Sequence, residues 1–201
     1  SFNNGENSPH PYFICQQAYS SIFKEKKNQS ILVSGESGAG KTQTSKIIMD
    51  YLSAISKKCE LKIDKKILNS TPILESFGNA KTLRNDNSSR FGKYIKINFS
   101  KKGIIIGCKI ETYLLEKVRL IYQTQGERNF HIFYQILAGF SKELKKKYFL
   151  DENNFRYLSN GIIKREDGIN DKEEFDNLLF SFQVLGISEK EKNNIFNIIV
   201  S

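Results

Sequence analysis

Apolar residues recur along most of this chain at the helical spacing of three to four positions. This spacing predicts helices over residues 11–26, 41–55, 64–77, 129–140 and 171–185, and a further helix after Ser188. Pro72 falls inside the third of these segments, where it should kink or divide the helix. Asp171 with Glu174 forms a capping-box pattern at the start of the fifth helix, and Ser188 with Glu191 repeats the pattern before the last one.

Strand patterns are shorter and fewer. Residues 31–34 form a brief apolar run between turn residues, which suits a buried strand. Residues 94–100 alternate between apolar and polar side chains, and residues 104–113 are rich in isoleucine. The sequence SKKG between them supplies a turn in which Gly103 can take a positive φ angle. These two segments are therefore predicted to form a β-hairpin.

Composition narrows the class of protein only moderately. The 201 residues are 39% hydrophobic with a formal net charge of +9, and no apolar run approaches the roughly 18–20 residues of a membrane span. The lysines are scattered, so the charge alone does not identify an acidic partner. Cys15, Cys59 and Cys108 lie far apart, which favours buried or half-buried thiols in a reducing cytoplasm over a disulfide framework or a zinc site.

The stretch ILVSGESGAGKTQTSKII, residues 31–48, contains a phosphate-binding pattern. Its central residues match G-x-x-x-x-G-K-[ST] and are Gly35, Glu36, Ser37, Gly38, Ala39, Gly40, Lys41 and Thr42. The glycines let the backbone curl so that its N–H groups point at phosphate oxygens, and the following helix adds partial positive charge. We therefore predict a P-loop, in which Lys41 contacts the β- and γ-phosphates and the Thr42 hydroxyl binds Mg²⁺.

A second polar segment precedes the predicted hairpin. The sequence NAKTLRNDNSSRFGKYIKI, residues 79–97, brings several hydrogen-bonding side chains into a loop before a strand: Asn85, Asn87, Ser88 and Ser89. These groups suit phosphate, Mg²⁺ and an attacking water, and Arg90 is a planar cation that could pair with a carboxylate. Without further information, an ordinary polar surface loop explains this segment equally well.

Several segments together resemble the myosin motor domain. In chain order they are GESGAGKT, ILESFGNAKT, NDNSSRFGKYI and YLLEKVRLIYQTQGERNFHIFYQIL, and the later FDNLLFSFQVLGISEKEKNNIFNIIV resembles the upper lobe of that family. The resemblance covers residues 9–200 and is far more specific than a P-loop alone. It implies an α/β fold: a P-loop NTPase-type core with part of a twisted mixed sheet flanked by helices, plus a mainly helical upper-lobe segment.

The resemblance also implies boundaries within the motor domain. Residues 1–141 would be the nucleotide-binding core and include the hairpin, which belongs to the transducer in this family. Residues 142–201 would be a helical segment of the upper lobe. The basic connector at residues 56–62 would be a variable surface loop implicated in nucleotide release.

Roles for individual residues follow from the same resemblance. Residues 35–42 would hold ATP, with Lys41 also acting in catalysis. Residues 85–90 would be switch I, the loop that closes over the γ-phosphate. Asn85 and Asn87 would bind the nucleotide, and Ser88 would help to place the lytic water. Ser89 would join Thr42 as a Mg²⁺ ligand. Arg90 would pair with a glutamate of switch II.

Two elements of the family do not occur in these 201 residues: the switch II motif D-x-x-G-F-E and the Asn-Pro segment that contacts the purine. We therefore expect an internal piece of a motor domain, in which Arg90 lacks its partner. Because positioning and charge stabilisation do nearly all of the catalysis in such enzymes, this piece alone should hydrolyse ATP poorly or not at all.

The full-length protein is expected to be a Mg²⁺-dependent ATPase that moves along actin filaments. The resemblance implies filamentous actin and light chains as partners, no nucleic acid, no membrane span, and a cytoplasmic, cytoskeletal location. A nucleotide-binding scaffold that no longer cycles is the main alternative, and an intact switch II would separate the two. A kinesin-like motor and a small-molecule kinase fit less well, because kinesins continue S-S-R with Ser-His whereas Phe91 follows here.

Three residues outside the P-loop and switch I segments could also be considered as catalytic groups. His131 lies within NFHIFYQ, where we expect a packed helical histidine. Glu127 and Arg128 are expected to form structural ion pairs or caps.

Overall fold

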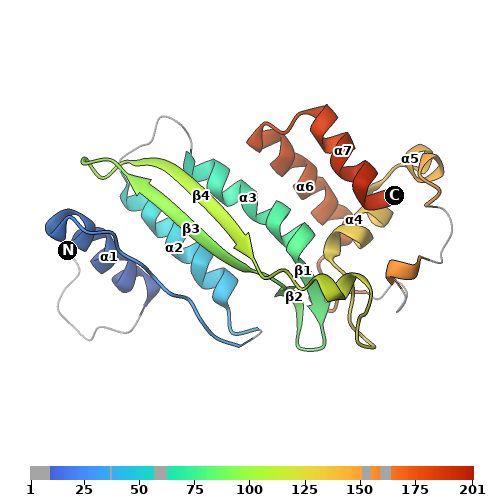
Figure 1. Ribbon diagram of the computed structural model, residues 1–201, viewed down its shortest axis with the longest axis horizontal. Helices are drawn as coiled ribbons and strands as arrows, with labels where there is room; N and C mark the ends of the chain where they lie inside the picture. Colours follow the sequence, from blue (N-terminus) through green and yellow to red (C-terminus); the bar gives the residue numbers. More distant parts are fainter. Residues whose placement is uncertain (1–9, 37, 57–62, 151–154, 159–163) are drawn as a thin grey trace. The chain divides into compact units, whose positions relative to one another are not determined.

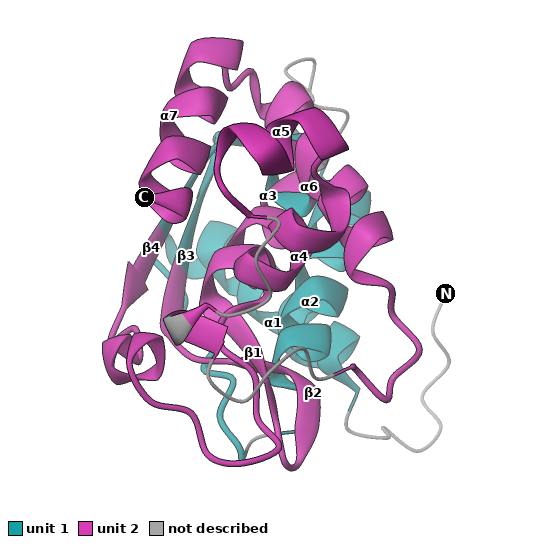
Figure 2. Ribbon diagram, turned by 90° about the vertical axis from the view of Figure 1, so that its right-hand side faces the viewer, with its two compact units in different colours: residues 1–68, 95–110 teal, residues 69–94, 111–201 magenta. Residues whose placement is uncertain are grey.

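A computed structural model of the protein describes residues 10–36, 38–56, 63–150, 155–158 and 164–201. Two compact units are formed, one by residues 1–68 with 95–110 and the other by residues 69–94 with 111–201 (Figure 2). Ser37, Cys59 and residues 57–62 of the predicted connector at residues 56–62 lie outside the described residues. The predicted boundary between residues 141 and 142 refers to lobes of a complete motor domain and stays a prediction.

The first unit contains two helices that pack against each other, α1 (Pro11–Glu25) and α2 (Lys41–Ile55) (Figure 1). Both were predicted from their apolar spacing. The ring of Tyr12 on α1 stacks on that of Tyr51 on α2, with 4.8 Å between the centroids. Cys15 is buried between them, and Cys108 is half-buried, so both thiols lie where the composition suggested.

The predicted hairpin is confirmed. Strands β3 (Gly92–Phe99) and β4 (Ile105–Tyr113) pair in a two-stranded sheet, and Gly103 in their turn has a φ angle of 79°. The predicted strand at residues 31–34 is wrong, because this stretch is irregular and Leu32 is 90% exposed. A buried strand needs a neighbour to satisfy its backbone groups, and none of the described strands pairs with it.

Helix α3 (Ile63–Gly78) runs without interruption through Pro72, so the expected division of the helix is wrong. A proline removes one backbone hydrogen bond and costs about 3 kcal/mol in a helix interior. Ile73 and Phe77 pack against the core of the second unit and hold the helix together on the far side of the proline.

The second unit is built on the antiparallel hairpin of β1 (Asn79–Thr82) and β2 (Asn85–Ser89) and on three main helices. These helices are α4 (His131–Gly139), α6 (Asp171–Leu185) and α7 (Glu189–Val200) (Figure 1). Shorter elements are η1 (Lys117–Leu120), α5 (Lys142–Lys147) and η2 (Arg156–Leu158). The core consists of Phe130, Ile132, Ile136, Phe140, Phe175, Leu178, Phe182 and Phe196.

The two predicted helix caps have different outcomes. The capping box of Ser188 with Glu191 is present at the start of α7. The box of Asp171 with Glu174 is wrong, because Asn170 caps α6 and accepts a hydrogen bond from the N–H of Lys172 at 2.8 Å. Asp171 is the first residue of α6, and its carboxylate forms an ion pair with Arg128. None of the described helices is long and apolar enough to cross a membrane.

Candidate functional site

The backbone of the predicted P-loop curls through three glycines. Gly35, Gly38 and Gly40 have φ angles of 153°, 85° and 85°, which side-chain-bearing L-residues rarely adopt. Gly40 is also the residue before α2, so the turn leads directly into the helix N-terminus. The local pattern and the local geometry agree here, because glycine is the residue that takes these angles at the lowest cost.

Lys41 lies at the first position of α2 and reaches back over the loop. Its Nζ donates to the carbonyl oxygens of Gly35 and Glu36, each at 2.6 Å. The loop residues around it are exposed, and Lys41 and Thr42 are half-buried. An ammonium held by two backbone carbonyls can exchange these partners for phosphate oxygens without rebuilding the loop.

The second predicted site segment is a strand rather than a loop. β2 pairs with β1 so that Ser88 lies opposite Ala80 and Ser89 opposite Asn79, with an irregular step between Ala80 and Thr82. The sequence prediction missed this strand because its polar side chains lack an apolar alternation. The backbone partner comes from β1, which is itself bridged to Phe130 on its other side.

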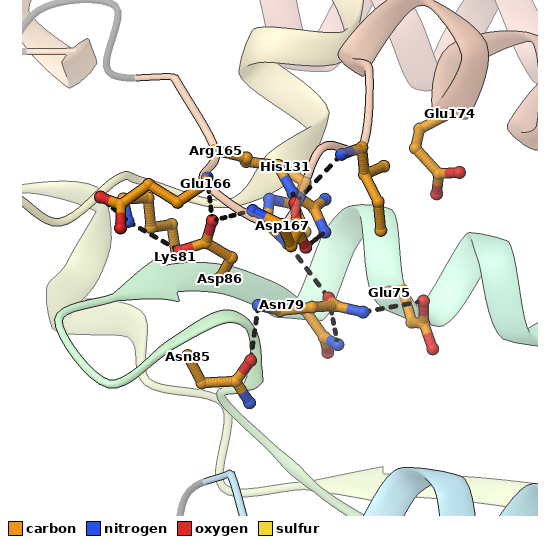
Figure 3. Close-up of polar contacts among 12 residues, drawn as sticks. Glu75, Asn79, Lys81, Asn85, Asp86, His131, Arg165, Glu166, Asp167 and Glu174 are labelled. Carbon is orange, nitrogen blue, oxygen red and sulfur yellow. Dashed lines mark hydrogen bonds and ion pairs between the residues drawn. The ribbon is translucent and has the colours of Figure 1, made fainter.

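The amide of Asn87 points into the protein. Its Oδ1 accepts from Asn79 Nδ2 at 2.9 Å, and its Nδ2 donates to Glu75 Oε2 at 3.2 Å (Figure 3). The Oδ1 of Asn85 accepts from the N–H of Asn87 at 2.9 Å, while its Nδ2 donates to none of the described residues. Asn85 therefore has a donor available for a ligand, whereas the amide of Asn87 is occupied by protein groups.

His131 is the packed histidine that the sequence indicated. It is 1% exposed, and its Nε2 lies 3.1 Å from Asn87 Oδ1. Because this oxygen is an acceptor, Nε2 carries the proton and Nδ1 does not. Burial, reinforced by the charges of Arg165 and Arg128, holds the pKa of His131 well below its usual value. The ring is therefore neutral, and it holds β2 through its contact with Asn87.

Asp86 connects β2 to the segment that precedes α6. Its carboxylate accepts from Lys81 Nζ at 2.6 Å and from the backbone N–H groups of Glu166 and Asp167 (Figure 3). Burial would raise the pKa of Asp86, but these hydrogen bonds outweigh it and lower the pKa. The side chains of Asp86 and Lys81 are 11% and 6% exposed, so this is a largely buried ion pair.

Arg90 has a partner in the described part of the chain, which corrects the expectation that it lacks one. Its Nε donates to Glu116 Oε2 at 2.7 Å, and its Nη1 donates to Ser88 Oγ at 3.0 Å. The expectation considered only switch II as a source of the carboxylate. Glu116 lies just after β4, and its backbone N–H donates to the carbonyl of Arg90 at 2.9 Å, so the backbone itself brings the two side chains together.

Glu127 and Arg128 have the structural roles that were expected, but with separate partners. Glu127 pairs with Arg119 at 3.0 Å, and Arg128 pairs with Asp171 at 2.7 Å. The guanidinium of Arg128 also lies over the ring of Tyr134, 3.7 Å from its centroid. Arg128 is completely buried, and these contacts offset only part of its lost hydration, because its Nε and Nη1 have no hydrogen-bond partner among the described residues.

Sequence reasoning missed two residues of this neighbourhood, Asp86 and Glu116. Asp86 stands between the two asparagines of the NDNSSR motif, which was the signal that could have drawn attention to it. Glu116 carries no such signal, because it lies 26 positions from Arg90. The P-loop belongs to one compact unit and residues 85–90 to the other. The assembly of both segments into one nucleotide site therefore stays a prediction.

Comparison with known proteins decides the family. The family model described as myosin head (motor domain) matches residues 2–201. This chain belongs to the myosin head family. It is 48% identical over 196 residues to myosin type-2 heavy chain 1 of Schizosaccharomyces pombe. It is 48% identical over 192 residues to the myosin-I heavy chain of Dictyostelium discoideum. It is 46% identical over 198 residues to unconventional myosin-XV of Homo sapiens.

These matches cover nearly all of this myosin-head chain but little of the relatives. They include 95%, 95% and 98% of the chain, against 13%, 8% and 6% of the three relatives. The architecture of this part is one of mixed helices and small antiparallel sheets, and it is now identified as part of a myosin motor domain.

Proposed function

We propose that this chain is the nucleotide-binding part of an actin-based motor. In the full-length protein it binds MgATP, and hydrolysis drives movement along actin filaments. The observation that carries the proposal is the loop at residues 35–40, whose glycines have positive φ angles and whose carbonyls hold the ammonium of Lys41. In this reading the loop and α2 belong to a P-loop NTPase-type core.

The residues present fit a magnesium nucleotide. The loop backbone and the N-terminus of α2 favour anions, and Lys41 can exchange two carbonyl partners for phosphate oxygens. The hydroxyls of Thr42 and Ser89 are oxygen ligands of the kind that Mg²⁺ prefers. When bound, Mg²⁺ neutralises charge on the phosphate oxygens.

The β2 segment supplies the remaining protein groups. Asn85 has an amide N–H₂ available for a phosphate oxygen, because only its Oδ1 is engaged. Ser88 is 3% exposed, and its hydroxyl accepts from Arg90, so both groups are held in one orientation. We assign Ser88 and Arg90 to placing the attacking water and stabilising charge. The half-buried amide of Asn87 donates to Glu75 and accepts from Asn79, and any contact with nucleotide requires it to leave these partners.

The wider assignments rest on family membership. We propose association with filamentous actin through other parts of the motor, light chains on the full-length protein, and a cytoskeletal location. The division into a core at residues 1–141 and an upper-lobe segment at residues 142–201 is part of the same proposal. The chain by itself is proposed to hydrolyse ATP poorly, since it contains no D-x-x-G-F-E motif.

Co-sedimentation of the full-length protein with filamentous actin, with and without MgATP, tests the proposal. The wild-type protein should pellet with actin and be released by MgATP. Lys41→Ala should pellet in both conditions, because the phosphates lose their lysine contact. Pelleting of the wild-type protein that ignores MgATP would refute the motor and leave a nucleotide-binding scaffold.

A further inference from the structure

The guanidinium of Arg90 is fixed from two sides within the second unit. Nε donates to Glu116 at 2.7 Å, and Nη1 donates to Ser88 Oγ at 3.0 Å. Its remaining nitrogen, Nη2, donates to none of the described residues, and the side chain is 25% exposed. Glu116 therefore holds Arg90 by one edge and leaves Nη2 available for a second acceptor.

Glu116 is itself held firmly. Its Oε2 also accepts from Arg119 Nε at 2.7 Å, so two guanidinium groups meet at a single carboxylate oxygen. Arg119 is only 5% exposed and is fixed in turn by the carbonyl of Arg128 at 2.9 Å and by Glu127 at 3.0 Å. This chain of contacts leads from a buried cation to the exposed edge of Arg90.

The charges favour the ionised form of Glu116. Burial would raise the pKa of its carboxyl, but the hydrogen bonds from Arg119 and Arg90 outweigh burial and lower the pKa. A carboxylate that is charged and hydrogen-bonded by two arginines is a rigid acceptor, because charge-assisted bonds are shorter and stronger than neutral ones.

We propose that Glu116 is a positioning residue for hydrolysis, acting through Arg90 on Ser88. This inference rests on the proposed function, which assigns Arg90 and Ser88 to the hydrolytic step. Glu116 orients the guanidinium so that Nη1 donates to the Ser88 hydroxyl and Nη2 stays available for a second acceptor. In this role Glu116 acts through Arg90 alone, so its removal should impair the chemical step and spare nucleotide binding.

Glu116→Gln in the full-length protein tests this assignment, because glutamine keeps the shape and removes the charge. The rapid phosphate burst after mixing with MgATP measures hydrolysis. The rate at which fluorescent (mant) ATP binds measures nucleotide binding at the P-loop. We expect the burst rate to fall by roughly tenfold or more, because small misplacements of catalytic groups are costly. Binding should stay within about twofold, because the described side-chain contacts of Glu116 are with Arg90 and Arg119, neither of which belongs to the P-loop.

Glu127→Gln is the matched control. It removes a carboxylate from the same network, but this carboxylate bonds Arg119 and the backbone N–H of Leu83. Its burst rate should stay close to that of the wild-type protein. An equal fall in both variants would show a general structural role and overturn the proposal. An unchanged or faster burst in Glu116→Gln would also overturn it, the faster burst because Glu116 would then be a competitor for Arg90.

Glu116→Asp provides a second variant if Glu116→Gln fails to fold. Aspartate keeps the negative charge but has a shorter side chain. The burst rate should therefore lie between that of the wild-type protein and that of a variant without the carboxylate. A wild-type rate would count against a positioning role for Glu116. Failure of the proposed function is recognised separately, because a wild-type protein without MgATP-dependent burst would refute the motor regardless of Glu116.

Discussion

The two candidate site segments, the P-loop at residues 35–42 and strand β2 with Arg90, are held in place by different means. The loop is exposed and is shaped by glycine φ angles and by Lys41 bonding its own carbonyls, all within eight consecutive residues. The β2 segment takes its partners from α3, β1, α4 and the chain before α6 and after β4. The comparison shows why only the first could be recognised by its spacing alone.

The different ways in which the loop and β2 are held in place predict different effects of mutation on function. A loop stabilised by its own backbone can exchange ligands at little cost to the rest of the fold. A strand whose side chains contact several elements cannot move without affecting them, so its position depends on the surrounding unit. We therefore expect changes in the loop to affect nucleotide binding and changes around β2 to affect stability and the chemical step.

Asp86→Ala should show the largest effect on stability. It leaves the ammonium of Lys81 and two backbone N–H groups without their main acceptor in a largely buried place. Removing one partner of a buried ion pair costs about 3–5 kcal/mol in free energy of unfolding, and denaturant titration would measure it. Lys41→Ala is the control, with an expected change below about 0.5 kcal/mol, because its contacts are exposed. Comparable losses in both variants would contradict the comparison.

Gly40→Ala should show an intermediate effect. A Cβ at this position would meet no atom within 4 Å, so the cost comes only from the φ angle of 85°. The expected cost is about 1–2 kcal/mol, together with weaker nucleotide binding. Gly186→Ala is closely matched, with a φ angle of 77° and equally open space, but it ends α6. It should lose similar stability and keep nucleotide binding, as measured by thermal unfolding and fluorescent nucleotide titration.

The smallest effect should be a pH dependence of stability that comes from His131, whose ring contacts Asn87 in β2. Because burial lowers the pKa of His131 below its ordinary value of about 6.5, the unfolded chain binds a proton before the folded one does. The stabilisation that the neutral ring provides is fully present above about pH 6.5, and the free energy of unfolding decreases as the pH falls below that value. His131→Gln retains a donor for Asn87 and should flatten this slope between about pH 6.5 and 5. An unchanged slope in His131→Gln would contradict this prediction.

Most helices, the β3–β4 hairpin and the glycine turn before α2 could be predicted because each depends on neighbours a few positions away in the chain. The helical spacing placed α1 and α2 almost to the residue, and Gly103 marked the hairpin turn. The same local reasoning was wrong at residues 31–34 and at Pro72. There the outcome depends on whether a strand finds a partner and on whether packing compensates for a lost hydrogen bond.

By itself, the sequence determined the family resemblance and the curled turn that leads into α2, since glycines and a lysine at fixed spacing carry their own geometry. Only the tertiary structure decided that residues 85–89 form a strand, that Asp86 anchors it and that Glu116 holds Arg90. The contacts of Asp86 with the backbone of residues 166 and 167, and of Glu116 with Arg90, join residues 26 to 81 positions apart, and no local pattern specifies such a pair. They form because the fold brings these partly or largely buried charges near groups that can pair with them, and a charge removed from water needs an opposite charge or a hydrogen bond.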